Sequence, residues 1–193
     1  MIDGKISEYR IAVLGLHGQG KSGLIQRLCA NAFSDTPHTE SEQQSTAVWE
    51  NSFVYFWEIP TDQVNGQNAD SIVVGFSSII FVFDLTTINS SDFDKSRLYL
   101  EDLMKAKSIS SIPFLIVGTK ADLIDDITEI KPSKLMGTLA ENLKKTQLIF
   151  FSAKEERGAT EIQNWILQRA LTVHECEVAQ SDKSSQLSLK SNF

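Results

Sequence analysis

Short, almost continuously hydrophobic runs alternate along the chain with longer segments in which apolar residues recur at helical spacing. A run of this kind, bounded by turn residues, is typical of a strand that is buried on both faces of a sheet. The weaker stretch Ser45–Trp49 precedes the second run, and the polar residues between them predict a hairpin whose first strand lies at a sheet edge. The hydrophobic runs are Ile11–Leu16, Phe53–Ile59, Ser78–Leu85, Pro113–Val117 and Leu148–Phe151.

The segments between these runs predict helices. Strands that alternate with helices imply crossover connections and a mostly parallel sheet with helices on both faces, so the expected fold class is α/β. The predicted helices are Lys21–Ala32, Ser91–Lys107, Pro132–Lys145 and Ala159–Leu171.

Two polar regions interrupt this pattern and set the expected domain boundary. Residues Asn31–Gln44 lack periodicity and are rich in turn-forming residues, which indicates a surface loop. The stretch His174–Phe193 is rich in Ser, Gln and Lys and is interpreted as a disordered tail. We therefore expect one domain over residues 1–173, a size that suits a single hydrophobic core, followed by the tail over residues 174–193.

Composition and charge exclude several classes of protein. Of the 193 residues, 41% are hydrophobic and 22% charged, so there is material for a core. With 18 basic and 25 acidic residues the net charge is −7, which argues against nucleic acid as a partner. Cys29 and Cys176 are too few for a disulfide scaffold, and the sequence shows neither a signal peptide nor the ~20 apolar residues that cross a bilayer. These features favour a soluble, cytoplasmic protein.

The strongest chemical signal is Gly15-Leu16-His17-Gly18-Gln19-Gly20-Lys21-Ser22, which fits the pattern G-x-x-x-x-G-K-[ST]. It follows a predicted strand and opens a predicted helix, where backbone N–H groups and the positive helix end form a nest for phosphate oxygens. In this arrangement Lys21 reaches the terminal phosphates and the Ser22 hydroxyl binds Mg²⁺. His17 is expected near the phosphates. The alternative is a glycine turn that only closes the strand–helix junction, and the context favours phosphate binding.

Two later motifs indicate which nucleotide is bound. Thr119-Lys120-Ala121-Asp122 and Ser152-Ala153-Lys154 each follow a hydrophobic run, so both are expected at the edge where parallel sheets bind ligands. Asp122 can accept hydrogen bonds from N1–H and the N2 amine of guanine, and the backbone N–H of Ala153 can meet O6. The Lys120 stem can lie along the base. Each motif alone is weak, because a solvated loop would look the same, but together they support a guanine site.

These motifs together resemble those of the Ras-superfamily small GTPases, over about residues 9–172. Gly15–Ser22 is similar to that superfamily's phosphate loop, Thr119–Asp122 to its NKxD guanine motif and Ser152–Lys154 to its SAK motif. Thr119 stands where the guanine motif usually has Asn, a variant found within the superfamily.

The branch and the ligands are also suggested by the resemblance. Ile79–Asp84 and Leu100–Leu103 look most like the Arf-like branch, whereas Ser152–Lys154 is more similar to Ras or Rab proteins. The resemblance implies a six-stranded sheet with five parallel strands and one antiparallel edge strand. It also implies GTP or GDP and Mg²⁺ as ligands, and protein effectors or a multiprotein complex as partners.

The superfamily's third motif, D-x-x-G followed by a glutamine that orients the attacking water, is altered here. With the register set by Trp57, Glu58 replaces the aspartate that holds Mg²⁺ through a water. Thr61 then replaces the glycine and Asp62 the glutamine, while Gln63 could serve only if the loop shifted by one residue. The longer Glu58 suits octahedral Mg²⁺ less well, a β-branched residue resists the backbone pivot of glycine, and a negative Asp62 would face an anionic phosphate.

The superfamily also uses a loop threonine to bind Mg²⁺ and sense the γ-phosphate. Thr36, Thr39 and Thr46 are candidates for this residue, and spacing favours Thr39. Of the acidic residues that follow Asp122, Asp125 and Asp126 are interpreted as part of a solvated loop.

Two functions stay open. The chain is either a regulatory switch or complex subunit that binds GTP and hydrolyses it slowly, or a scaffold that does not hydrolyse GTP and binds protein partners. A P-loop phosphotransferase would have no use for the two base motifs. Ile2 excludes N-myristoylation and Lys190–Phe193 offers no cysteine for prenylation, so we expect no direct lipid anchor, and recruitment to a membrane would depend on a protein partner.

Overall fold

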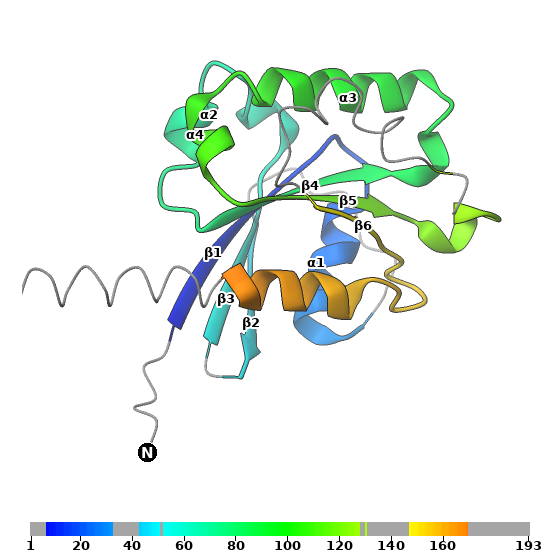
Figure 1. Ribbon diagram of the computed structural model, residues 1–193, viewed down its shortest axis with the longest axis horizontal. Coiled ribbons are helices and arrows are strands. Elements are labelled where there is room, and N and C mark those ends of the chain that lie inside the picture. The colour runs from blue at the N-terminus through cyan, green and yellow to red at the C-terminus, as the bar shows by residue number, and fades with distance from the viewer. Residues whose placement is uncertain (1–6, 33–42, 51, 128–129, 131–146, 170–193) are drawn as a thin grey trace, which may run out of the picture.

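A six-stranded sheet forms the centre of the molecule, with the strand order β2-β3-β1-β4-β5-β6 (Figure 1). The computed structural model describes residues 7–32, 43–50, 52–127, 130 and 147–169. β2 and β3 are antiparallel, and all other neighbouring strands are parallel, so the predicted α/β class and sheet are confirmed. The strands are β1 (Ser7–Leu14), β2 (Gln43–Trp49), β3 (Ser52–Glu58), β4 (Ser78–Asp84), β5 (Phe114–Thr119) and β6 (Gln147–Phe150).

Helices cover both faces of the sheet (Figure 1). α1 (Lys21–Ala30) and a helix at residues 159–169 lie on one face. On the other face lie α2 (Ala69–Ile72), α3 (Ser91–Leu103) and α4 (Lys107–Ser111). In the part of the chain that the structure describes, no helix has the length and apolar character that crossing a bilayer requires.

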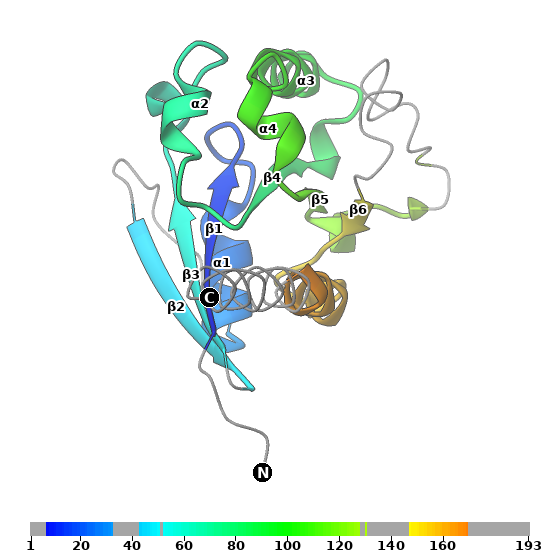
Figure 2. The ribbon, with the colours of Figure 1, turned by 60° about the vertical axis from the view of Figure 1, so that its left-hand side comes forward.

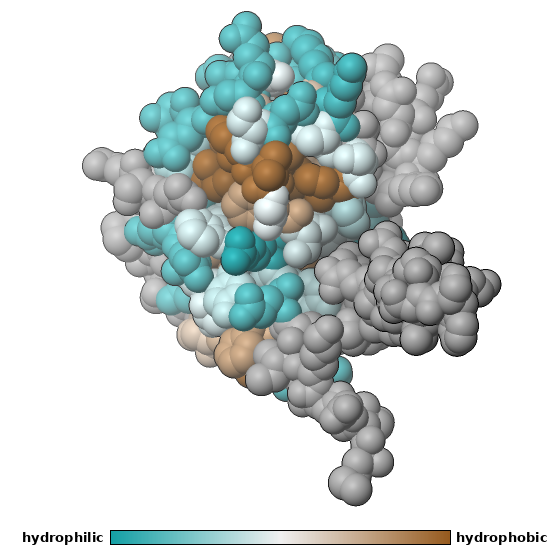
Figure 3. Space-filling model, turned by 90° about the vertical axis from the view of Figure 1, so that its left-hand side faces the viewer, coloured by the Kyte–Doolittle hydropathy of each residue, from teal (hydrophilic) through white to brown (hydrophobic). Residues whose placement is uncertain are grey.

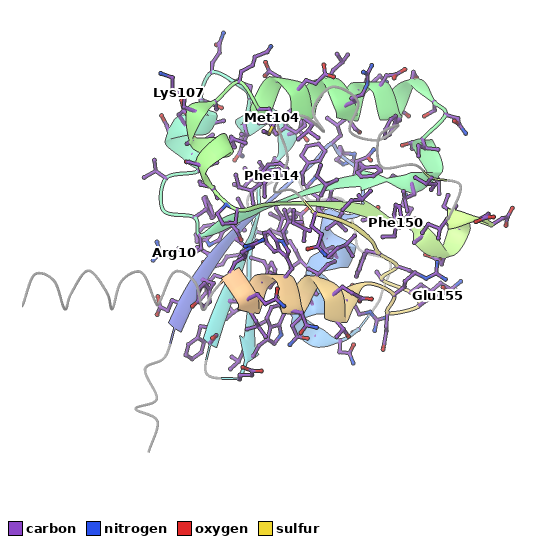
Figure 4. All side chains as sticks on the ribbon, viewed as in Figure 1. Arg10, Met104, Lys107, Phe114, Phe150 and Glu155 are labelled. Atoms are coloured by element: carbon purple, nitrogen blue, oxygen red, sulfur yellow. The ribbon has the colours of Figure 1, made fainter. Side chains whose placement is uncertain are left out.

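Buried side chains form two clusters, one on each face of the sheet. The α1-side core includes Leu24 and Trp165, and the α3-side core includes Leu103. Neighbouring residues of a strand point to opposite faces, so β1 contributes Ile11 and Val13 to the α1-side core and Ala12 and Leu14 to the α3-side core. Figure 4 shows Phe114 and Met104, both of the α3-side cluster, between the sheet and the helices above it.

Burial follows the predicted pattern only in the middle of the sheet. Every residue of β4 and β5 is buried. In β3, however, Tyr55 and Trp57 are half-buried and only alternate residues are fully covered. β3 lies next to the edge strand β2 (Figure 2), where one face of the sheet has less cover. In β6, the other edge strand, Ile149 alone is fully buried, while Leu148 and Phe150 are half-buried against the α3-side core. These two runs therefore have full cover on one face and partial cover on the other.

Two predicted helices end earlier than their hydrophobic spacing suggested. α1 stops at Ala30 because Asn31 adopts a left-handed conformation with φ of 49° and donates its N–H to the carbonyl of Arg27. The predicted helix Ser91–Lys107 ends at Leu103, and after the extended Ala106 a separate helix, α4, begins at Lys107. The N–H of Ser108 at the start of α4 donates to Asp70 of α2 over 2.8 Å, so a tertiary partner replaces the missing helical carbonyl.

Three other predictions fall wholly or partly outside the described residues. They concern the helix Pro132–Lys145, the tail 174–193 and most of the loop Asn31–Gln44. At the end of that loop Gln43 and Gln44 are paired with β3, so the strand starts before the predicted Ser45.

An apolar area lies on the side of the molecule shown in Figure 3. It surrounds the loop between α2 and β4, where Val74 is 76% exposed and Ile72 and Phe76 are half-buried. This loop enters the sheet at the amino end of β4. The carboxyl ends of the parallel strands therefore lie at the opposite edge, and the predicted site residues follow them.

Candidate functional site

The loop between β1 and α1 has a backbone shape that depends on glycine. Gly15, Gly18 and Gly20 have φ of 145°, 75° and 92°, values that residues with a side chain rarely adopt. A Cβ at Gly15 would also stand 2.3 Å from the carbonyl oxygen of Val82 in β4. The loop ends at the amino terminus of α1, where free N–H groups and the helix dipole suit an anion. This geometry fits the phosphate site predicted for Gly15–Ser22, in which His17 is exposed and Leu16 half-buried.

Lys21 lies across this loop. Its ammonium Nζ donates to the carbonyl oxygens of Gly15 at 3.0 Å and Leu16 at 3.1 Å, and the residue is only 7% exposed. Burial lowers the pKa of Lys21, and the negative charge of Glu58 acts in the opposite direction. Phosphate oxygens beside Nζ would favour the charged form further, which suits a residue that binds a polyanion.

Two oxygen atoms that could bind a metal ion lie together at the start of α1. The Ser22 hydroxyl donates a hydrogen bond to Oε1 of Glu58 over 3.0 Å, and Glu58, the last residue of β3, is 4% exposed. A hydroxyl and a carboxylate are hard ligands of the kind Mg²⁺ prefers. The predicted pair of Ser22 and Glu58 therefore fits a magnesium site, and the longer side chain of Glu58 reaches Ser22.

The segment after β3 is attached to the phosphate loop. The hydroxyl of Thr61 donates to the carbonyl oxygen of Gly15 over 2.9 Å, and residues Thr61–Gln63 form a single turn of 3₁₀ helix. Pro60 has φ of −60° and is buried. Asp62 and Gln63, the candidates for orienting water, are both exposed. At the position where the superfamily has glycine, the side chain of Thr61 thus binds the phosphate loop.

The two predicted base motifs meet through side-chain contacts. Ser152, which is fully buried, donates its hydroxyl to Oδ1 of Asp122 over 2.6 Å. The same hydroxyl accepts the N–H of Glu155 at 3.1 Å, which fixes the turn after β6. Asp122 itself is half-buried. Lys154 is exposed.

Lys120 and Thr119 link the base side to the rest of the site. Lys120 has a left-handed backbone with φ of 58°, and its Nζ lies 2.5 Å from Oδ2 of Asp84. The hydroxyl of Thr119 donates to the carbonyl of Gln19 over 2.7 Å, and Gln19 in turn accepts the backbone N–H of Asp84 through its side chain. The phosphate loop and the base motif are therefore joined directly by buried hydrogen bonds.

Two contributors were absent from the sequence prediction. Asp84 ends β4 and pairs with Lys120, but an acid at the end of a hydrophobic run gives no sign of its partner. Arg27 is buried in α1 and donates to the carbonyl of Ala153 over 2.6 Å. Its only sequence signal is a long cation between Leu24 and Leu28, where helical spacing predicts an inward-facing position.

Some predicted candidates are not brought to the site. Thr46 lies inside β2, opposite Tyr55, so it is a strand residue and the interpretation as a loop ligand was wrong. Thr36 and Thr39 lie outside the described residues. Asp125 and Asp126 are exposed, and among the residues that the structure describes no three acids, histidines or cysteines group as a metal cluster.

Comparison with known proteins identifies the family. The family model described as "ADP-ribosylation factor family" matches residues 1–170. The chain is 20% identical to ADP-ribosylation factor-like protein 8c of Arabidopsis thaliana over 86% of this chain and 89% of the relative. It is 32% identical to Ras-like protein family member 10B of Homo sapiens, over 61% and 64%, and 25% identical to Ras-related protein RabC of Dictyostelium discoideum, over 95% and 92%. With its phosphate loop and guanine motifs assembled at one sheet edge, the chain belongs to the ADP-ribosylation factor family of small GTPases.

Proposed function

We propose that this small GTPase binds GTP and GDP with Mg²⁺ and acts as a regulatory switch or complex subunit that hydrolyses GTP slowly or not at all. One observation carries the proposal. The hydroxyl of Thr61 donates a hydrogen bond to the carbonyl of Gly15 in the phosphate loop, which ties down the segment that would orient the attacking water. The binding residues Lys21 and Asp122, by contrast, are held by hydrogen bonds at the expected places.

Support for nucleotide binding comes from the fit of this chain's residues to each part of the ligand. The loop N–H groups and Lys21 suit the phosphates, and Ser22 with Glu58 suits Mg²⁺. Asp122, held by the buried Ser152, offers the acceptors that guanine requires. Mg²⁺ when bound would neutralise phosphate charge, and the residues named here would orient it.

Support for slow hydrolysis comes from the residues after β3. A water that attacks the terminal phosphate must be oriented by a side chain at a defined place. Asp62 stands at the position of the superfamily glutamine, where its negative charge repels an anionic phosphate. Gln63 follows it in the same 3₁₀ turn, and the buried Pro60 and the Thr61 bond oppose the one-residue shift that would bring Gln63 into place.

Hydrolysis can be tested with the protein loaded with GTP in single-turnover assays. We expect the variant with Glu58→Asp, Thr61→Gly and Asp62→Gln to hydrolyse GTP ~10–100-fold faster than the wild type, because it restores the residues that position water and metal. Phosphate release is measured across a Mg²⁺ titration, and Asp125→Asn, an exposed acid, is the control. Fast hydrolysis by the wild-type protein, with no further gain in the triple variant, would contradict the proposal.

The segment Pro60–Ile72 is also held at points remote from the phosphates. The N–H of Gly66 donates to Oδ2 of Asp102 in α3 over 2.7 Å, and a Cβ at Gly66 would stand 2.4 Å from the Asp102 carbonyl oxygen. This N–H and the ammonium of Lys105 lower the pKa of Asp102, which keeps its carboxylate charged as an acceptor. With the Asp70–Ser108 contact, these bonds tie the segment to α3 and α4 through residues of the chain itself.

A segment held in this way should respond little to the state of the nucleotide. We expect amide hydrogen exchange over residues 59–72 to be similar in the GDP form and with a non-hydrolysable GTP analogue. Thr61→Val, which removes the hydroxyl and keeps the branched shape, should increase exchange about fivefold in both forms, since one hydrogen bond contributes ~1 kcal/mol. Thr160→Val on the exposed side of the last described helix is the control. Protection that appears only with the GTP analogue would show that the segment is an ordinary switch.

The same attachment favours a second function, a scaffold whose surface is constant. Such a chain would bind protein partners regardless of nucleotide state, and we propose a cytoplasmic location with recruitment to a membrane through a partner. The nucleotide content of the purified protein separates the two functions. GTP retained over many hours supports a slow switch, whereas a preparation that neither contains nor binds guanine nucleotide supports the scaffold.

A further inference from the structure

One buried arginine fastens the loop after β6 to α1. Arg27 is 7% exposed, and its Nε donates to the carbonyl oxygen of Ala153 over 2.6 Å. Nη1 donates to Oε1 of Glu156 at 2.8 Å and to the carbonyl of Asn31 at 3.2 Å, while Nη2 reaches the carbonyl of Lys154 at 3.5 Å. The guanidinium therefore joins three residues of one loop to the carboxyl end of α1.

The same helix face also lies close to this loop at a second point. Gly23 lies one helical turn before Arg27, and a Cβ at Gly23 would stand 3.8 Å from the Cβ of Ala153. Because Lys21 and Ser22 open this helix, the element that carries phosphate and metal ligands also carries the support for the base loop. The distance between the phosphate and base halves of the site is thus set through α1.

Ala153 is held from both sides. On its amino side the buried Ser152 donates to Asp122, and on its carboxyl side the Ala153 carbonyl accepts from Arg27. The backbone N–H of Ala153, which the sequence motif leads us to expect at guanine O6, therefore lies between two fixed points. Glu156 is 60% exposed and screened by solvent, so the contacts to backbone carbonyls carry the positioning.

The chemistry of arginine suits this task. Its planar guanidinium presents five N–H donors in a rigid fork, so it can hold several carbonyls in one geometry, which a lysine ammonium does not do. A buried cation without partners is unstable, so the loop carbonyls and Arg27 depend on each other.

We propose that Arg27 is a positioning residue for guanine recognition, which holds the Ala153 backbone N–H where it can donate a hydrogen bond to O6. The inference rests on the proposed function, because it requires a guanine nucleotide in this site. It gives a specificity role to a helix residue that lies outside the phosphate loop and both base motifs.

Nucleotide analogues can separate positioning from simple loss of stability. 6-Thio-GDP keeps N1–H and the N2 amine but replaces O6 by a larger and weaker acceptor, whereas IDP keeps O6 and lacks the N2 amine that Asp122 recognises. We expect Arg27→Met to weaken GDP binding ~10-fold and to lower the preference for GDP over 6-thio-GDP ~5-fold or more. The preference for GDP over IDP should be unchanged, because the Asp122 contact remains.

The measurement is the dissociation constant of each nucleotide on the full chain, with hydrogen exchange over residues 152–158 as a readout independent of the ligand. Arg27→Lys keeps the charge and guards against a variant that fails to fold; it should give a smaller loss in the same direction. Arg97→Met changes a partly exposed arginine of α3 that pairs with Asp94 and Glu101; it is the matched control and should match the wild type.

The outcomes distinguish the two proposals. If both Arg27 variants keep the wild-type preference over 6-thio-GDP, or lose both preferences equally, Arg27 has no positioning role even though the site binds guanine. If the wild type binds GDP no better than 6-thio-GDP and IDP, the guanine site itself is wrong, and the role of Arg27 falls with it.

Discussion

Asp122→Asn is expected to lower the affinity for GDP by roughly 1,000-fold or more and to raise that for xanthosine diphosphate. A site built to bind a donor pair rejects the wrong partner strongly, because buried polar groups are then left unpaired. The carboxylate of Asp122 accepts from Ser152 through Oδ1, which fixes its plane. An amide in that plane would turn an N–H towards the N2 amine of guanine, and xanthine offers an oxygen at this position.

The measurement is competition between the two nucleoside diphosphates on wild type and variant at one Mg²⁺ concentration. Asp125→Asn is the control, since Asp125 is exposed in the same stretch of chain. An Asp122→Asn protein with undiminished GDP affinity would falsify the assignment of the base site.

Gly15→Ala should have the second largest effect, on both folding and binding. A Cβ there would stand 2.3 Å from the carbonyl oxygen of Val82, and the φ of 145° is unfavourable for any residue with a side chain. Backbone in the middle of a sheet cannot move aside without losing ladder hydrogen bonds. We expect a loss of about 3 kcal/mol or more in the free energy of unfolding, as strain and overpacking combine.

Denaturant unfolding of the two proteins measures this loss. The matched control is Gly23→Ala, whose Cβ would meet only Ala153 at 3.8 Å, an ordinary contact. Alanine is the better helix former there, so this control should be neutral or more stable by up to ~1 kcal/mol. Equal stability of the two variants would show that the close approach at Gly15 relaxes freely.

The sequence predicted the parts of the fold that depend on local pattern. β4 and β5 were predictable because continuous hydrophobic runs need cover on both faces, and the phosphate loop because its glycines and Lys21 stand at fixed spacing before a helix. The break between α3 and α4 was not predictable. It depends on Asp70, which is distant in the chain and replaces a helical carbonyl for Ser108.

The site divides in the same way. The residue types of Lys21, Ser22 and Asp122 were sufficient to predict a guanine nucleotide site, since the chemistry lies in the motifs themselves. The hydrogen bond from Thr61 to Gly15 could not be predicted, because nothing in a threonine indicates which carbonyl it will meet. Arg27 was missed for a similar reason. Its partners are backbone carbonyls, which every residue has, so residue types do not show which carbonyls it will meet.

The alternation of β1 between two cores separates two properties of the molecule. Ile11 and Val13 support the face that carries α1, Arg27 and the base loop, whereas Ala12 and Leu14 support the face on which the segment after β3 is held. We therefore expect a change of packing at one residue of β1 to affect chiefly the loop after β6, and a change at the next residue to affect chiefly the segment after β3. Neighbouring positions of one strand would then tune the proposed nucleotide affinity and the mobility of that segment separately.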